Sequence, residues 1–128
     1  MKKRTLQLTL FTFLLVLVTG CSTHNTALYN YADYSENYYA YKKNPSTESQ
    51  LELQKAIELA IENAQDSQSG RVAPGLYANL GYIYLKEGKN KLALENFKKE
   101  KALYPESARF MDRMIKKVEM LEGDNDEK

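Results

Sequence analysis

The chain has one cysteine, Cys21, and one histidine, His24, as its candidates for nucleophilic or metal chemistry. A single thiol cannot form an intrachain disulfide, and one Cys with one His cannot build a multi-ligand zinc site. His24 lies in a short polar stretch, so it suits no Ser–His–carboxylate arrangement. The carboxylates of Glu58 and Glu62 are four residues apart, which is ordinary on the polar face of a helix. We therefore expect a protein that is not an enzyme, with no catalytic residue, metal or cofactor.

A segment typical of secretory signal peptides precedes the cysteine. Residues 1–4 form a cationic head, and residues 6–18 are almost entirely apolar. This run is too short to span a bilayer, which needs about 20 helical residues. The alternative is a buried N-terminal helix. It fits less well, because the run is apolar on all sides and carries a cationic head.

The end of this segment resembles the lipobox of bacterial lipoproteins, in which a branched apolar residue and two small residues precede a cysteine. Here the four residues are Val18, Thr19, Gly20 and Cys21. Small side chains at Thr19 and Gly20 allow a peptidase to approach the backbone, and a thiol accepts the diacylglyceryl group. We expect residues 1–20 to be a lipoprotein signal peptide, cleaved between Gly20 and Cys21, with Cys21 lipidated.

The remaining chain divides by composition into a tether, a domain and a tail. Residues 21–27 are small and polar, and we interpret them as a lipidated tether. Ser22 stands where Asp favours retention of a lipoprotein in the inner membrane, so we expect an outer-membrane anchor and a domain that faces the periplasm. Residues 28–121 form the domain. Residues 122–128 carry too little apolar surface to order themselves and predict a disordered acidic tail.

The charge of the chain argues against a polyanion partner. Lys and Arg number 18 against 17 Asp and Glu, for a net charge of +1, and loss of Lys2, Lys3 and Arg4 with the leader changes it to −2. Such a balance gives no electrostatic attraction to nucleic acid. We therefore expect the chain to bind no nucleic acid, and to be attached to a membrane through its N-terminal lipid.

The domain shows the 3.6-residue period of helices and no strand alternation. Pro45 interrupts the first period, and Gly88 suits a left-handed helix end. We expect five helices joined by short turns, at residues 28–43, 48–66, 74–88, 90–104 and 106–121.

The third and fourth helices reproduce the spacing of one tetratricopeptide repeat, at about residues 74–107. Gly81 and Ala93 allow the two helices to approach, and Phe97 fills the gap between them. Glu100 departs from the pattern, since a small residue is usual there. The positions that carry the pattern are Tyr77, Leu80, Gly81, Tyr84, Ala93, Phe97 and Pro105.

One repeat cannot bury both of its faces, so it needs neighbours. Tyrosines of the first helix echo the spacing of the third, which predicts that the first two helices form a degenerate repeat. The fifth helix then caps the stack. The predicted fold class is all-α, built from antiparallel helical hairpins.

Three sequence blocks also resemble a family of small tetratricopeptide-like bacterial outer-membrane lipoproteins of unknown function. They are the Leu28–Tyr29 start, residues 73–82 and residues 100–112. In that family the gene often lies beside those of two other lipoproteins, one of which resembles the curli secretion channel. The resemblance implies a part in a cell-envelope assembly and supplies no catalytic residue.

Candidate partner-binding residues follow from the repeat, because the first helix of each hairpin lines the concave groove. Tyr82 and Lys86 lie four apart there and are suited to grip an extended peptide, although an ordinary amphipathic surface is an equal alternative. Tyr29 and Tyr39 lie at the edge of the first helix's tyrosine stripe or off it, and are further contact candidates. We interpret most of the stripe itself as core. It consists of Tyr31, Tyr34, Tyr38 and Tyr41.

The expected function is an interaction module, of accessory or pilotin type, for a cell-envelope assembly or secretion complex. The expected partner is an envelope protein, and a lipoprotein similar to the curli secretion channel is one candidate. The alternative is an envelope-maintenance factor that binds peptidoglycan or lipid through a tyrosine-lined groove.

Overall fold

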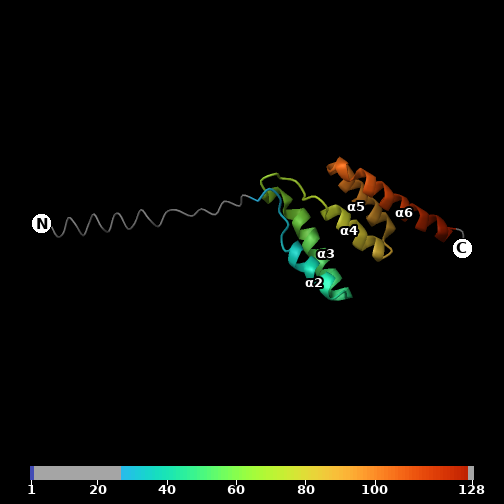
Figure 1. The fold of residues 1–128 in the computed structure, drawn as a ribbon, viewed down its shortest axis with the longest axis horizontal. Coiled ribbons are helices and arrows are strands. Elements are labelled where there is room, and N and C mark those ends of the chain that lie inside the picture. The colour runs from blue at the N-terminus through green and yellow to red at the C-terminus, as the bar shows by residue number, and fades with distance from the viewer. Residues whose placement is uncertain (2–26, 127–128) are drawn as a thin grey trace.

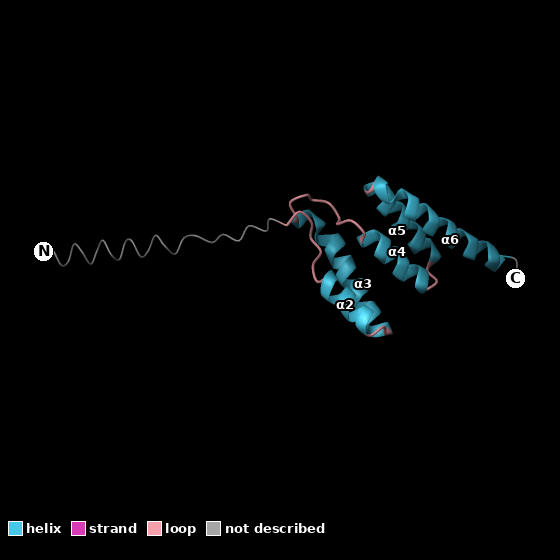
Figure 2. Ribbon diagram, viewed as in Figure 1, coloured by secondary structure: helices cyan, strands magenta, loops and turns pink. Residues whose placement is uncertain are grey.

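The structure is a computed structural model that describes Met1 and residues 27–126. The predicted signal peptide lies outside these residues except for Met1, and so does the predicted tether except for Ala27. Within the described part there are helices and no strands, as predicted for an all-α chain. No helix among these residues is long and apolar enough to cross a bilayer. Figures 1 and 2 show the helices as a stack of antiparallel hairpins.

The first hairpin consists of α2 (Tyr34–Lys43) and α3 (Thr47–Glu62), followed by the 3-10 turn η1 (Asn63–Asp66). Ser46 caps α3, and its side chain and that of Ser49 each accept a hydrogen bond from the other's backbone N–H. Ser46 and Ser49, which follow Pro45, thus form a capping box at the start of α3.

The helix expected from residue 28 begins later, at Tyr34. The carbonyl oxygens of Ala27 and Leu28 accept hydrogen bonds from the backbone N–H groups of Gln68 and Ser69, at 3.1 Å each. This pairing holds residues 27–29, which we call the strap, against the loop that follows η1. Because those carbonyls are bonded to another segment, they are not available to start a helix.

The second hairpin consists of α4 (Leu76–Lys86) and α5 (Asn90–Leu103). Gly88 joins them with a positive φ of 71°, as predicted for a left-handed helix end. Gly81 is buried where the helices cross. A Cβ at this position would lie 2.8 Å from Cε1 of Phe97 and 3.2 Å from the carbonyl oxygen of Ala93. The close approach expected of Gly81, Ala93 and Phe97 is therefore present.

The other residues of the repeat pattern differ in burial. Leu80 is buried in the core between α3 and α4, while Tyr77 and Tyr84 are half-buried beside it. Pro105 is exposed and opens the 3-10 turn η2 (Pro105–Ser107) after α5. The contacts within this hairpin are compatible with the tetratricopeptide interpretation, which stays a prediction.

The last helix, α6 (Ala108–Asp126), packs on α5 and extends beyond its predicted end. Met111 and Val118 are fully buried against Ala93 and Phe97 of α5. The sequence predicted a disordered tail from residue 122, whereas α6 continues through residue 126. An established helix gains one hydrogen bond for each residue added, so a polar segment can extend it without packing. Residues 127–128 lie outside the described part.

The loop between η1 and α4 is hydrogen-bonded to the end of α5. The guanidinium of Arg71 donates to the carbonyl oxygen of Leu103 at 2.8 Å, and the hydroxyl of Tyr104 donates to the carbonyl oxygen of Val72. Burial raises the pKa of Tyr104 to about 12, so its hydroxyl keeps its proton and remains a donor at neutral pH. The loop is thereby fastened to the α5–α6 corner.

Candidate binding groove

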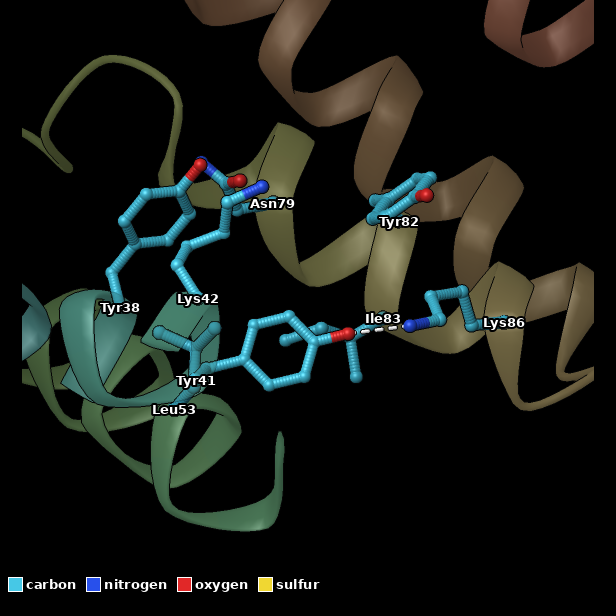
Figure 3. Close-up of a pocket in the computed structure, with 8 residues that line it drawn as sticks. All are labelled: Tyr38, Tyr41, Lys42, Leu53, Asn79, Tyr82, Ile83 and Lys86. Carbon is cyan, nitrogen blue, oxygen red and sulfur yellow. Dashed lines mark hydrogen bonds between the residues drawn. The ribbon is translucent and has the colours of Figure 1, made fainter. Parts of the chain in front are cut away.

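The two residues predicted to bind a partner, Tyr82 and Lys86, lie one turn apart on the exposed face of α4. They border a cavity of about 110 Å³ between the two hairpins. Tyr82 is 49% exposed, so one edge of its ring faces solvent. Figure 3 shows this cavity and its lining, to which three helices contribute: Tyr38, Tyr41 and Lys42 from α2, Leu53 from α3, and Asn79, Tyr82, Ile83 and Lys86 from α4.

The floor of this groove is rigid and apolar. Leu53 and Ile83 are 3% and 4% exposed and belong to the core that α3 and α4 share. Helices α3 and α4 are each fixed by several other buried side chains in that core. The aromatic residues above the floor therefore stand on a base that resists rearrangement.

Hydrogen bonds across the groove tie α2 to α4. The ammonium of Lys86 donates to the hydroxyl of Tyr41, as Figure 3 shows. The amide of Asn79 donates to the hydroxyl of Tyr34 at 3.1 Å and to the carbonyl oxygen of Gly75 at 2.9 Å. The Lys86–Tyr41 and Asn79–Tyr34 bonds each join residues 45 positions apart, so they set the distance between α2 and α4 across the groove. The bond from Asn79 to Gly75 is local to the start of α4 and orients the Asn79 amide.

The lining of the groove is cationic. Lys42 and Lys86 both face it, and no carboxylate is among its lining residues. The hydrogen bond with Tyr41 raises the pKa of Lys86 above its ordinary value, so Lys86 stays charged at neutral pH. Burial, reinforced by the nearby Tyr38, raises the pKa of Tyr34, so this hydroxyl remains protonated. The site thus offers positive charge beside tyrosine rings.

A row of tyrosines leads from the strap to the groove. The ring centroids of Tyr29 and Tyr31 are 6.5 Å apart, those of Tyr31 and Tyr34 are 6.1 Å apart, and those of Tyr34 and Tyr38 are 5.6 Å apart. These are the separations of favourable aromatic pairs. Tyr38 is 39% exposed at the groove end of this row.

The family profile of the domain of unknown function DUF4810 matches residues 28–114 of the chain. The chain belongs to this family. The matched region begins at the strap and ends within α6, so it includes every residue that lines the groove. No curated protein and no solved structure is significantly similar to the chain.

Within the DUF4810 domain, the prediction that most of the tyrosine stripe is core is wrong. No residue of α2 is buried. Tyr34 and Tyr41 are half-buried against the core of α3 and α4, while Tyr31 and Tyr38 remain exposed. Helix α2 lies at the edge of the core formed by α3 and α4. No helix of the described part precedes α2, so its other side is left uncovered.

The other two contact candidates lie away from the groove. Tyr39 is 68% exposed and does not line it. Tyr29 is half-buried and packs against the core beside the strap. The sequence analysis missed Tyr38, Tyr41, Lys42 and Asn79 as groove residues. The repeated tyrosine spacing of the first and third helices was the available signal, since two equivalent helices should line the same face.

On the opposite side of the domain, Glu58 and Glu62 border a shallow surface between α3 and α5. The hydroxyl of Tyr84 and the amide of Gln54 donate to Glu58 at 3.1 Å and 2.8 Å. Burial, together with the hydrogen bond to Glu58, raises the pKa of Tyr84. The Glu58 carboxylate thus links α3 to α4 at the surface. No group of residues in the described part of the chain is arranged to hold a metal ion.

Glu100, which departs from the repeat pattern, has a structural role in the DUF4810 domain. It is 3% exposed, and its carboxylate accepts hydrogen bonds from the backbone N–H groups of Gly75, at 2.8 Å, and Ala78, at 3.3 Å. A negative charge at the N-terminus of α4 satisfies unpaired donors and complements the helix dipole. Glu100 of α5 therefore caps the start of α4.

Proposed function

We propose that this DUF4810 protein is a lipoprotein anchored to the outer membrane through Cys21, with its helical domain in the periplasm. There it acts as an accessory or pilotin-like module, binding a protein partner of a cell-envelope assembly or secretion complex. The proposal for the anchor rests on the sequence around Cys21. The proposal for partner binding rests on the groove.

The observation that carries partner binding is the pairing of exposed aromatic rings with fixed positive charge on a rigid floor. Tyr38 and Tyr82 stand on opposite sides of the groove, with Lys42 and Lys86 beside them. Tyrosine supplies a large contact area at a small cost in side-chain entropy, and it is enriched among residues that dominate binding energy. This combination suits a segment of a partner chain that carries apolar and acidic groups.

The tetratricopeptide interpretation supports the same location. In such arrays the first helix of each hairpin lines the concave groove, and here α2 and α4 are both first helices. Both contribute to the lining of one cavity. The proposed partner, an envelope protein such as a lipoprotein similar to the curli secretion channel, follows from the family resemblance alone.

The test of binding is a paired comparison of variants in a pull-down from detergent-solubilised envelope. We expect the Tyr82→Ala, Lys86→Ala double variant to keep its helical content and melting temperature but to lose a partner that the parent protein captures in defined stoichiometry. The matched control is Tyr39→Ala with Lys43→Ala, which removes the same residue types at the same spacing from the far side of α2. Equal capture by the parent and the groove variant would exclude this groove.

The anchor has its own test. Cys21→Ala should prevent processing and abolish partitioning of the protein into a detergent phase. If the variant still partitions as a lipoprotein does, the proposal of a lipid anchor fails, whatever the result for the groove.

A rival function uses the same groove for peptidoglycan or lipid, and the exposed rings of Tyr38 and Tyr82 favour it because aromatic faces stack on sugars. Binding of purified peptidoglycan fragments by the parent protein, lost in the Tyr82→Ala, Lys86→Ala variant, would support the rival. Capture of a protein in fixed stoichiometry without glycan would support the interaction module.

A further inference from the structure

Helix α6 carries apolar side chains on two sides, of which only one packs inside the protein. Met111 and Val118 are buried against α5. The opposite side carries Arg109, Phe110, Arg113, Lys116, Lys117 and Met120, which we call the outer face of α6. The four cations and Met120 lie at positions 109, 113, 116, 117 and 120. This spacing follows the helix period, so these side chains project from one side of the helix.

The outer face combines positive charge with exposed apolar side chains. Phe110 is 53% exposed and Met120 is 64% exposed, and the guanidinium of Arg113 lies 5.7 Å from the centre of the Phe110 ring. None of its four cations takes part in an ion pair with another described residue. The acidic Asp112 lies toward the other side, where it pairs with Lys101 of α5.

The start of this helix lies at the same end of the domain as the point where the tether enters. Ala27 is hydrogen-bonded to Gln68, and three residues further along that loop Arg71 is hydrogen-bonded to Leu103, just before α6 begins. Figure 1 shows the loop of residues 67–75 running between the first described residues of the domain and the second hairpin. Residues 21–26 reach at most about 20 Å when fully extended.

We propose that the outer face of α6 rests on the anionic phospholipid headgroups of the membrane that anchors the chain. This inference depends on the proposed lipid anchor at Cys21. The anchor holds the domain within a short distance of the leaflet, so even a weak surface contact is populated. Basic residues interleaved with Phe and Met are the chemistry of helices that lie in a membrane interface, and each cation near an anionic leaflet is attracted to it. The domain is then held in one orientation, with α6 against the membrane.

The test uses the full lipidated protein reconstituted into vesicles. Cys21 is the only cysteine, and lipidation consumes its thiol, so a cysteine introduced at one position is labelled alone. An environment-sensitive fluorophore is attached through Met120→Cys on the outer face. The matched control is the adjacent Glu119→Cys, which is also exposed but lies on the acidic side of the same helix.

In phosphatidylethanolamine vesicles with about a quarter phosphatidylglycerol, we expect the label at position 120 to gain roughly two-fold or more in emission, with a blue shift. The label at position 119 should change little. Replacing phosphatidylglycerol by phosphatidylcholine, or introducing Lys116→Glu with Lys117→Glu, should remove the gain while the protein still floats with the vesicles.

Three results would overturn the proposal. If the protein floats with both kinds of vesicle but the two labels behave alike, the anchor stands and the contact of α6 does not. If the gain at position 120 depends on the ratio of protein to lipid, a second copy of the chain covers the outer face. If the protein fails to float at all, the lipid anchor is absent and the contact fails with it.

Discussion

The first helices of the two hairpins occupy equivalent places but bury very different amounts of side chain. Helix α4 contributes Leu76, Leu80, Gly81 and Ile83 to the core, whereas α2 contributes no buried residue. Helix α4 is covered on both sides, by α3 and α5, while α2 packs on one side only. We infer a division of labour in which α4 and the helices packed on it supply stability, while α2 leaves its tyrosines available to a partner.

The largest expected effect that tests this division is at Phe97, which is 1% exposed at the centre of the second hairpin. Phe97→Ala should lower the free energy of unfolding by about 3–5 kcal/mol, because it removes buried area and leaves a cavity. Tyr38→Ala, in the first hairpin, should cost less than about 1 kcal/mol. Chemical denaturation of both variants measures the difference, and similar losses would contradict the division.

The next effect concerns the close approach at Gly81. The Cβ of Gly81→Val would lie 2.8 Å from Cε1 of Phe97, whose side chain is buried, and 3.2 Å from the carbonyl oxygen of Ala93. Overpacking of this kind costs about 1–3 kcal/mol, and thermal unfolding should show a clearly lower Tm. Gly88→Asn is the control, because nothing lies within 4 Å of a Cβ there and Asn tolerates the positive φ. If both variants melted like the parent, the two helices would not cross at Gly81.

A smaller effect is expected at Glu100, which caps α4 from α5. Glu100→Gln keeps the size of the side chain but replaces one acceptor oxygen by a donor facing the N–H groups of Gly75 and Ala78. We expect a loss of about 1–2 kcal/mol in the free energy of unfolding. Glu95→Gln removes an exposed ion pair with Lys99 on the same helix and should cost less than about 0.5 kcal/mol. Equal losses would show that the cap contributes nothing specific.

The smallest expected effect concerns the hydrogen bond between Lys86 and Tyr41 across the groove. Tyr41→Phe removes the hydrogen bond that raises the pKa of Lys86 above 10.5, so this pKa should fall toward its ordinary value. NMR titration of the Lys86 side chain measures the change. A raised lysine pKa stabilises the fold below the unfolded-state pKa and loses that contribution as pH rises through the folded-state value. The contribution to stability is therefore present at neutral pH, and only its loss falls in the alkaline range. An unchanged pKa in the variant would show that the bond across the groove does not form in solution.

Periodicity and turn residues were sufficient to predict most of the fold. The number and order of the helices in the domain, the left-handed turn at Gly88 and the contact of Gly81 with Phe97 all follow from local patterns in the sequence. They could be predicted because each depends on residues that are close in the chain. The helix period and the conformation of a glycine are local, and Gly81 and Phe97 lie on consecutive helices. The lipobox and the partner remain predictions.

Only the tertiary structure decided what α2 buries and where the groove lies. A tyrosine stripe looks alike whether one or two layers of helices cover it, and α2 is covered on one side only. The strap at residues 27–29 and the cap by Glu100 depend on bonds to segments at least 22 residues away, which no local pattern encodes. The sequence determined which helices form and how one pair of them packs. Tertiary contacts determined which of their faces remain exposed, because burial depends on what else the chain brings to each face.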